Sequence, residues 1–102
     1  MTELEQARKT INQADEEIAK LFEKRMEAVK TIAKYKKENH LPIEDKGREA
    51  EVVNRNSALI QSDEIRRYYI AFIDKAIEVS KDFQHDLIDW KIIKRILILS
   101  IV

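Results

Sequence analysis

The sequence has no cysteine and only one glycine and one proline among its 102 residues. The absence of cysteine excludes disulfides, thiolate metal sites and thiol nucleophiles, and it fits a reducing compartment. The scarcity of glycine and proline argues against a turn-rich sandwich or barrel. With 44% hydrophobic and 37% charged residues, the composition instead favours long helices. We therefore expect an all-α chain that forms a single domain.

An excess of charge of either sign is also missing, because 19 basic residues are balanced by 19 acidic ones. Such a chain has no global field that attracts nucleic acid or an anionic membrane, so we expect neither partner. Met1 to Gln6 lacks the basic and apolar segments of a secretion signal. The apolar stretch from Ile92 to Val102 is shorter than the roughly 20 residues of a membrane-spanning helix. A cytoplasmic location is the expectation.

The first third of the chain has a heptad pattern, with inward positions at alternating spacings of three and four. These positions are Leu4, Ala7, Ile11, Ala14, Ile18, Leu21, Arg25, Ala28, Ile32 and Tyr35. The pattern predicts one long helix from about Thr2 to Glu38. A helix of about 35 residues is roughly 50 Å long, which is more than a small monomeric domain needs. Its exposed stripe therefore predicts a partner subunit.

A second, shorter helix is expected after a break at Pro42. Proline disfavours helical geometry in the residue before it and cannot donate a backbone hydrogen bond. Asp45 can cap the new helix, which we expect to continue to about Ile60.

A third helix, also shorter than the first, is expected to begin at a cap formed by Ser62 or Asp63 and to end near Asp89. We assign residues 1–90 to the helical domain and residues 91–102 to an apolar C-terminal extension of unknown role. The extension either prolongs the third helix and packs on a dimer, or forms a poorly ordered, aggregation-prone tail.

Arg25 occupies a heptad position that should be apolar. A buried guanidinium is costly unless an acceptor meets it, so Arg25 either turns toward solvent, pairs with a glutamate, or belongs to a site. Lys36 lies on nearly the same helix face, about 16 Å further along the axis. Arg8 lies about 25 Å from Arg25, too far for both to hold one small molecule. An antiparallel partner could bring its own Arg8 into reach.

Polar residues also interrupt the other two helices. Asp45, Arg48 and Glu49 share one side of the first turn of the second helix, where capping and a surface ion pair are an alternative explanation. Ser80 and Gln84 lie one turn apart and can both face inward, although small buried polar groups can also be structural. Together with the cations of the first helix, these residues suit a small polyanion better than a metal or a nucleophile.

The combined spacing resembles that of the all-helical chorismate mutases. The matching pattern is Arg8-x2-Ile11-x3-Asp15-x2-Ile18-x2-Leu21-x3-Arg25, then Lys36, then Pro42-x2-Asp45-x2-Arg48-Glu49, and finally Ser80-x3-Gln84. The resemblance covers about Leu4 to Leu87. It implies a homodimer of intertwined chains with three helices each, in which each site receives Arg8 from the other subunit. It also implies that the protein isomerises chorismate to prephenate without a cofactor, in the shikimate pathway of aromatic amino-acid biosynthesis.

The resemblance also assigns roles to individual residues. Arg8 of the partner, Arg25 and Arg48 bind the anionic and nearby polar groups of chorismate, to which a planar guanidinium can donate paired hydrogen bonds. Lys36 and Gln84 donate to the ether oxygen, which gains negative charge as its bond to carbon breaks. Because glutamine is a neutral donor, activity should not require acid pH.

The remaining roles concern the ring hydroxyl and the carboxylate end of the substrate. Glu49, with Asp45 nearby, holds the hydroxyl, and Ser80 supports the carboxylate end. The residues implied as catalytic are Lys36, Gln84, Arg25 and Glu49. The reaction is a concerted intramolecular shift, so it needs no proton transfer and no covalent intermediate.

Two alternatives remain open from the sequence. A lyase of the same fold that releases pyruvate from isochorismate would use a similar cationic pocket. A non-catalytic helical dimerisation or regulatory module would use the polar interruptions only to set register and subunit orientation.

Overall fold

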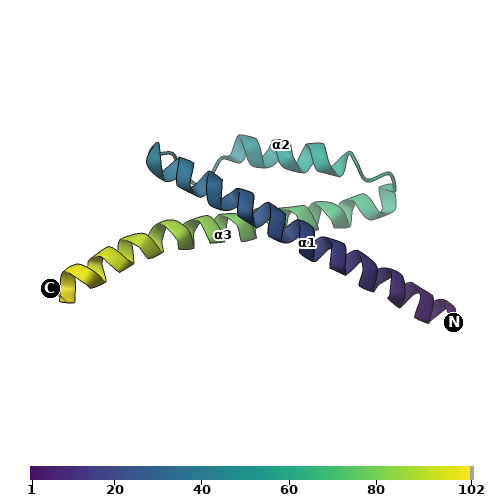
Figure 1. Cartoon of the computed structure of the whole chain (residues 1–102). Helices are drawn as coiled ribbons and strands as arrows, with labels where there is room; N and C mark the ends of the chain where they lie inside the picture. The colour runs from purple at the N-terminus through teal and green to yellow at the C-terminus, as the bar shows by residue number, and fades with distance from the viewer. Residues whose placement is uncertain (102) are drawn as a thin grey trace.

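The computed structural model describes the backbone of residues 1–101 and the side chains of residues 1–88. This part of the chain consists of three α-helices and contains no strand. The helices are α1 (Glu3–Glu38), α2 (Lys46–Ser57) and α3 (Asp63–Ile101), shown in Figure 1. The all-α prediction and the predicted number of helices are confirmed.

The length of α3 corrects two predictions. It has 39 residues against 36 in α1, so the expectation of one long and two shorter helices is wrong. It also passes the predicted end near Asp89, because no glycine or proline interrupts the chain between Asp63 and Ile101. The backbone of residues 91–101 thus prolongs α3, whereas its packing on a dimer stays a prediction. Over the described residues, no helix is long and apolar enough to cross a membrane.

The two later helices begin directly after predicted capping residues. Asp45 precedes α2, and its Oδ1 accepts a hydrogen bond of 3.0 Å from the backbone N–H of Arg48. Ser62 precedes α3, and its Oγ accepts from the backbone N–H of Ile65 at 3.3 Å. Both caps satisfy a backbone donor that has no partner inside the first turn of its helix.

Helix α3 is the platform on which the other two helices pack. Helix α1 crosses α3 near the middle of each, and α2 runs beside the first half of α3 (Figure 1). Of the side chains described, four apolar ones are buried, and they come from α1 and α3: Val29, Ala33, Ile73 and Ile77. The buried apolar core of the chain is therefore small and lies near this crossing.

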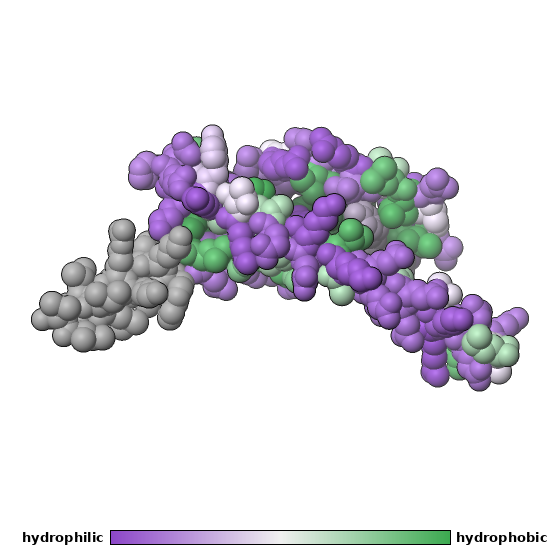
Figure 2. All heavy atoms as spheres, in the orientation of Figure 1, coloured by the Kyte–Doolittle hydropathy of each residue, from purple (hydrophilic) through white to green (hydrophobic). Residues whose placement is uncertain are grey.

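The two long helices project from the crossing in opposite directions. The N-terminal half of α1 extends to one side and the C-terminal half of α3 to the other (Figure 1), so the chain measures 65 × 32 × 17 Å. Its radius of gyration is 18.5 Å, whereas a compact chain of this length has about 13 Å. In the view of Figure 2, apolar residues gather where the helices meet, and the projecting half of α1 is mostly hydrophilic.

The apolar stripe of α1 is largely uncovered within one chain. Leu4, Ile11 and Leu21 keep 58%, 56% and 61% of their surface exposed, although a heptad pattern normally marks a buried seam. The helix thus forms as predicted, but the described side chains of the same chain leave most of its N-terminal half uncovered.

Candidate functional site

A cavity of about 210 Å³ lies between the three helices, on the side of the crossing where α2 packs. Most of its apolar wall comes from Val29, Ile32, Val52 and Ile77. Its polar lining includes seven of the eight predicted site residues: Arg25, Lys36, Asp45, Arg48, Glu49, Ser80 and Gln84. Residues up to 59 positions apart in the sequence therefore meet around one cavity.

Arg25 reaches from α1 to α3. Its Nη1 donates to the hydroxyl of Ser80 and, at 3.4 Å, to the backbone carbonyl of Ala76. The Ser80 hydroxyl donates in turn to the same carbonyl at 2.8 Å. Neither of the two simpler alternatives for Arg25, exposure to solvent or pairing with a glutamate, describes its contacts. Within the described residues these contacts use only Nη1, so the other nitrogens of the planar group remain available to an anion.

Lys36 is the second cation of α1 at the cavity. Its Nζ donates to the backbone carbonyl of Ile43 at 2.6 Å, in the connection between α1 and α2. An ammonium group carries three donors, so this bond orients the side chain without using its whole capacity. Lys36 and Arg25 therefore present two positive charges along one wall.

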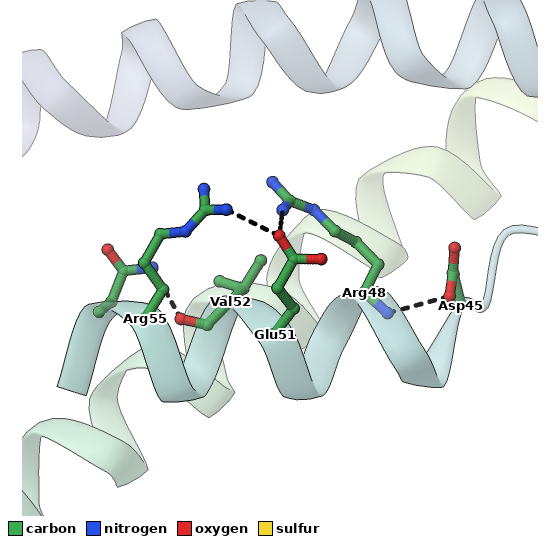
Figure 3. Close-up of polar contacts among 6 residues, drawn as sticks. Asp45, Arg48, Glu51, Val52 and Arg55 are labelled. Atoms are coloured by element: carbon green, nitrogen blue, oxygen red, sulfur yellow. Dashed lines mark hydrogen bonds and ion pairs between the residues drawn. The ribbon is translucent and has the colours of Figure 1, made fainter. Parts of the chain in front are cut away.

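Arg48 and Asp45 also make the ordinary contacts that the sequence left open as an alternative. Asp45 caps α2, and Arg48 forms an exposed ion pair of 3.0 Å with Glu51, which also pairs with Arg55 at 2.8 Å (Figure 3). Exposed ion pairs contribute little to stability, about 0 to 1 kcal/mol. Turning the Arg48 side chain from Glu51 to an anion in the cavity therefore costs little.

Glu49 faces α3 instead of solvent. Its Oε1 lies 2.7 Å from Nζ of Lys81, and both side chains are about three-quarters buried. Its Oε2 is buried and has no hydrogen-bond partner among the described residues. Buried polar atoms without a partner are uncommon, and here the atom belongs to a residue that lines the cavity.

Lys81 is the cavity residue that sequence reasoning missed. It directly follows Ser80 on α3. The hydrogen bond to Glu49 raises the pKa of Lys81, partial burial opposes this, and attraction by Glu49, Glu44 and Glu78 adds to the rise. The sequence shows an acidic residue on α2 and a basic residue on α3. It does not show that the two side chains meet, because this depends on how the two helices pack.

Ser80 and Gln84 are the most deeply buried polar side chains described, with 5% and 6% of their surface exposed. They lie one turn apart on α3, as predicted. The Oε1 of Gln84 is buried without a hydrogen-bond partner in the described part of the chain. Because an amide can turn to exchange its oxygen and nitrogen, either a donor or an acceptor can be presented to a ligand.

Arg8 is the one predicted site residue that does not line the cavity. It is an exposed residue on the projecting half of α1, seventeen positions before Arg25. The structure therefore agrees with the sequence in separating these two arginines within one chain. No group of three or more His, Asp and Glu side chains suited to a metal ion occurs among the described residues.

Comparison with known proteins identifies the family. No curated protein and no solved structure is significantly similar to the chain. The sequence model of the family described as chorismate mutase type II, however, matches residues 7–85, about three-quarters of the chain. This range includes all eight predicted site residues, and it confirms the resemblance found in the sequence. The chain therefore belongs to the type II chorismate mutase family.

Proposed function

We propose that this protein is a chorismate mutase, an isomerase that converts chorismate to prephenate in the biosynthesis of aromatic amino acids. The observation that carries the proposal is the convergence of Arg25, Lys36, Arg48 and Gln84, from three helices, on one small cavity. Three cations and a neutral amide suit a substrate with two carboxylates and an ether oxygen. Membership of the type II chorismate mutase family supports chorismate as that substrate.

Substrate binding in this proposal depends on the arginines. Arg25, held by Ser80, and Arg48, released from Glu51, donate to the anionic and nearby polar groups of chorismate, and Ser80 supports the carboxylate end. Glu49 accepts a hydrogen bond from the ring hydroxyl, with Asp45 nearby. These contacts select the compact conformer in which the two reacting carbons are close, which removes much of the entropic part of the barrier.

Catalysis in this proposal is electrostatic. The carbon–oxygen bond of the ether breaks while a carbon–carbon bond forms within the same molecule, so no proton or electron is exchanged with the protein. Lys36 and Gln84 donate to the ether oxygen, whose negative charge is greatest in the transition state. Donors that are already fixed in place stabilise the transition state more than the substrate, because the charge on the ether oxygen is greatest there. The apolar wall of Val29, Ile32 and Val52 limits screening of these hydrogen bonds by water.

The active form in this proposal is an intertwined homodimer. The exposed stripe of α1 supports it, as does a second, almost wholly apolar groove of about 350 Å³ beside the α1–α3 crossing, lined by residues such as Leu21, Phe22 and Phe72. The accessible surface of 8647 Å² is also well above the roughly 6,000 Å² of a compact monomer of this mass. An antiparallel partner would cover these surfaces and bring its Arg8 toward the cavity.

The test is the loss of chorismate absorbance with purified protein, with identification of the product. We expect prephenate from the wild type, a large loss of turnover in Arg25→Ala, and wild-type turnover in the matched control Arg67→Ala, which removes an exposed arginine of α3. If the protein released pyruvate from isochorismate and formed no prephenate, it would be the lyase of the same fold instead. A folded dimer that neither converts nor binds either substrate would indicate a non-catalytic module.

A further inference from the structure

Lys81 and Glu49 form a partly buried ion pair, in which the two carboxylate oxygens of Glu49 have different surroundings. Nζ of Lys81 lies 2.7 Å from Oε1 of Glu49, while Oε2 is buried and has no hydrogen-bond partner in the described part of the chain. Glu44 also approaches Nζ, at 3.9 Å, from the connection before α2. One oxygen is therefore held by the protein, and the other keeps its full capacity to accept a hydrogen bond.

We propose that Lys81 is a positioning residue that fixes the Glu49 carboxylate so that Oε2 accepts the hydrogen bond of the substrate's ring hydroxyl. This inference rests on the proposed function, because it concerns recognition of the same substrate at the same site. Lys81 acts through Glu49 and does not itself touch the reacting atoms. Its effect is on which molecules the cavity accepts.

The physical reason is that a glutamate side chain is flexible. Without a partner for Oε1, the carboxylate can rotate and present either oxygen, or neither, toward the cavity. A charge-assisted hydrogen bond from a side chain on a different helix restricts that rotation. The free oxygen then has one position, and a hydroxyl that meets it regains the hydrogen bond that Oε2 lacks.

Charge gives the pair a second role beside a dianionic substrate. An isolated carboxylate at Glu49 would repel the carboxylates of chorismate, and the repulsion would be strong in a partly buried cavity. The ammonium of Lys81 offsets this charge, so the acceptor is kept at a smaller electrostatic cost. This second role affects every dicarboxylate equally, whereas positioning affects only ligands that carry the hydroxyl.

The experiment uses this difference. Two competitive inhibitors are needed: a dicarboxylate analogue of chorismate that carries the ring hydroxyl, and its counterpart with hydrogen in place of the hydroxyl. Their inhibition constants are measured with the full-length wild type, Lys81→Met, Lys81→Arg and the control Lys30→Met, which removes an exposed lysine paired with Glu27 on α1.

We expect the wild type to bind the hydroxylated inhibitor about tenfold or more tightly than its counterpart, since a hydrogen bond to a charged acceptor distinguishes them. Lys81→Met should lose most of this preference, while Lys81→Arg and Lys30→Met should retain it. If Lys81→Met loses its helical circular dichroism, Lys81→Leu, which likewise has no donor, replaces it and should also lose most of the preference.

The outcomes separate the two proposals. A wild type that converts chorismate, with the preference unchanged in a folded Lys81 variant, overturns this inference alone. A weakening of both inhibitors by the same factor also overturns it, because only charge compensation would then remain. A wild type with no turnover overturns the proposed function, and this inference falls with it.

Discussion

The Arg25 guanidinium of α1 donates a hydrogen bond to the Ser80 hydroxyl of α3, 55 residues away in the sequence. This contact explains how a heptad position tolerates a charged side chain, because the partly buried guanidinium meets an acceptor on the opposing helix. It also aligns the arginine along the cavity wall. The same bond therefore stabilises the α1–α3 crossing and prepares the anion site.

Replacement of Ser80 by alanine should affect both stability and binding. Removing the hydroxyl takes an acceptor from a partly buried guanidinium, so we expect a loss of about 1 to 3 kcal/mol in the free energy of unfolding. The KM for chorismate should rise, because Arg25 is less well oriented. Urea denaturation and steady-state kinetics measure the two effects. Unchanged values in both would contradict the importance of the contact.

Replacement of Lys36 by alanine should remove most turnover. The substitution takes away a charge-assisted donor aimed at developing negative charge, an effect of about 10² to 10³ in kcat. Lys37→Ala, one residue further and exposed, is the matched control and should turn over at the wild-type rate. Near wild-type turnover in Lys36→Ala would rule out its role at the ether oxygen.

The neutral amide of Gln84 leads to a prediction about how turnover depends on pH. The amide donates in its neutral form, so wild-type kcat should not depend on acid conditions. In Gln84→Glu the side chain donates only when protonated, and a carboxyl group has an ordinary pKa of about 4.3. The rate of this variant should therefore rise as the pH falls, while the wild-type profile stays level over the same range. If the pH profiles of wild type and Gln84→Glu were parallel, Gln84 would not be the donor to the ether oxygen.

The Lys81–Glu49 pair predicts the alkaline dependence of stability. The hydrogen bond to Glu49 raises the pKa of Lys81 above the ordinary value of 10.5. A raised pKa in the folded state means that the stabilising contribution is fully present below the unfolded-state value and is lost as the pH rises through the folded-state value. The difference in urea midpoint between wild type and Lys81→Met should thus be constant at neutral pH and shrink above about pH 10. A difference that grows with alkaline pH would contradict the pairing.

Arg8 allows a test of the shared site by subunit mixing. Arg8→Ala and Arg25→Ala homodimers should each be nearly inactive. After unfolding and refolding together, half of the dimers should be mixed, and each mixed dimer contains one complete site. Activity should therefore return to about one quarter of the wild-type value, as two-fold symmetry requires. No recovery would show that Arg8 acts within its own chain, whereas an active Arg8→Ala homodimer would show that Arg8 has no role at the site.

The sequence alone determined the presence and order of the three helices, and it predicted seven of the polar residues that line the cavity. Heptad spacing, the break at Pro42 and the cap at Asp45 are local properties, so the presence and order of three helices followed from them. The end of α3 was misplaced because the apolar periodicity fades after Leu87 while no residue stops the helix.

Only the tertiary structure decided which side chains meet. The bonds of Arg25 with Ser80 and of Glu49 with Lys81 join different helices, and no local pattern specifies how those helices pack. The unequal environments of the two Glu49 oxygens are likewise a result of packing. Helical periodicity places a residue on a face of its own helix. Its partner depends on the crossing of two helices, which is set by the burial of residues such as Val29 and Ile77.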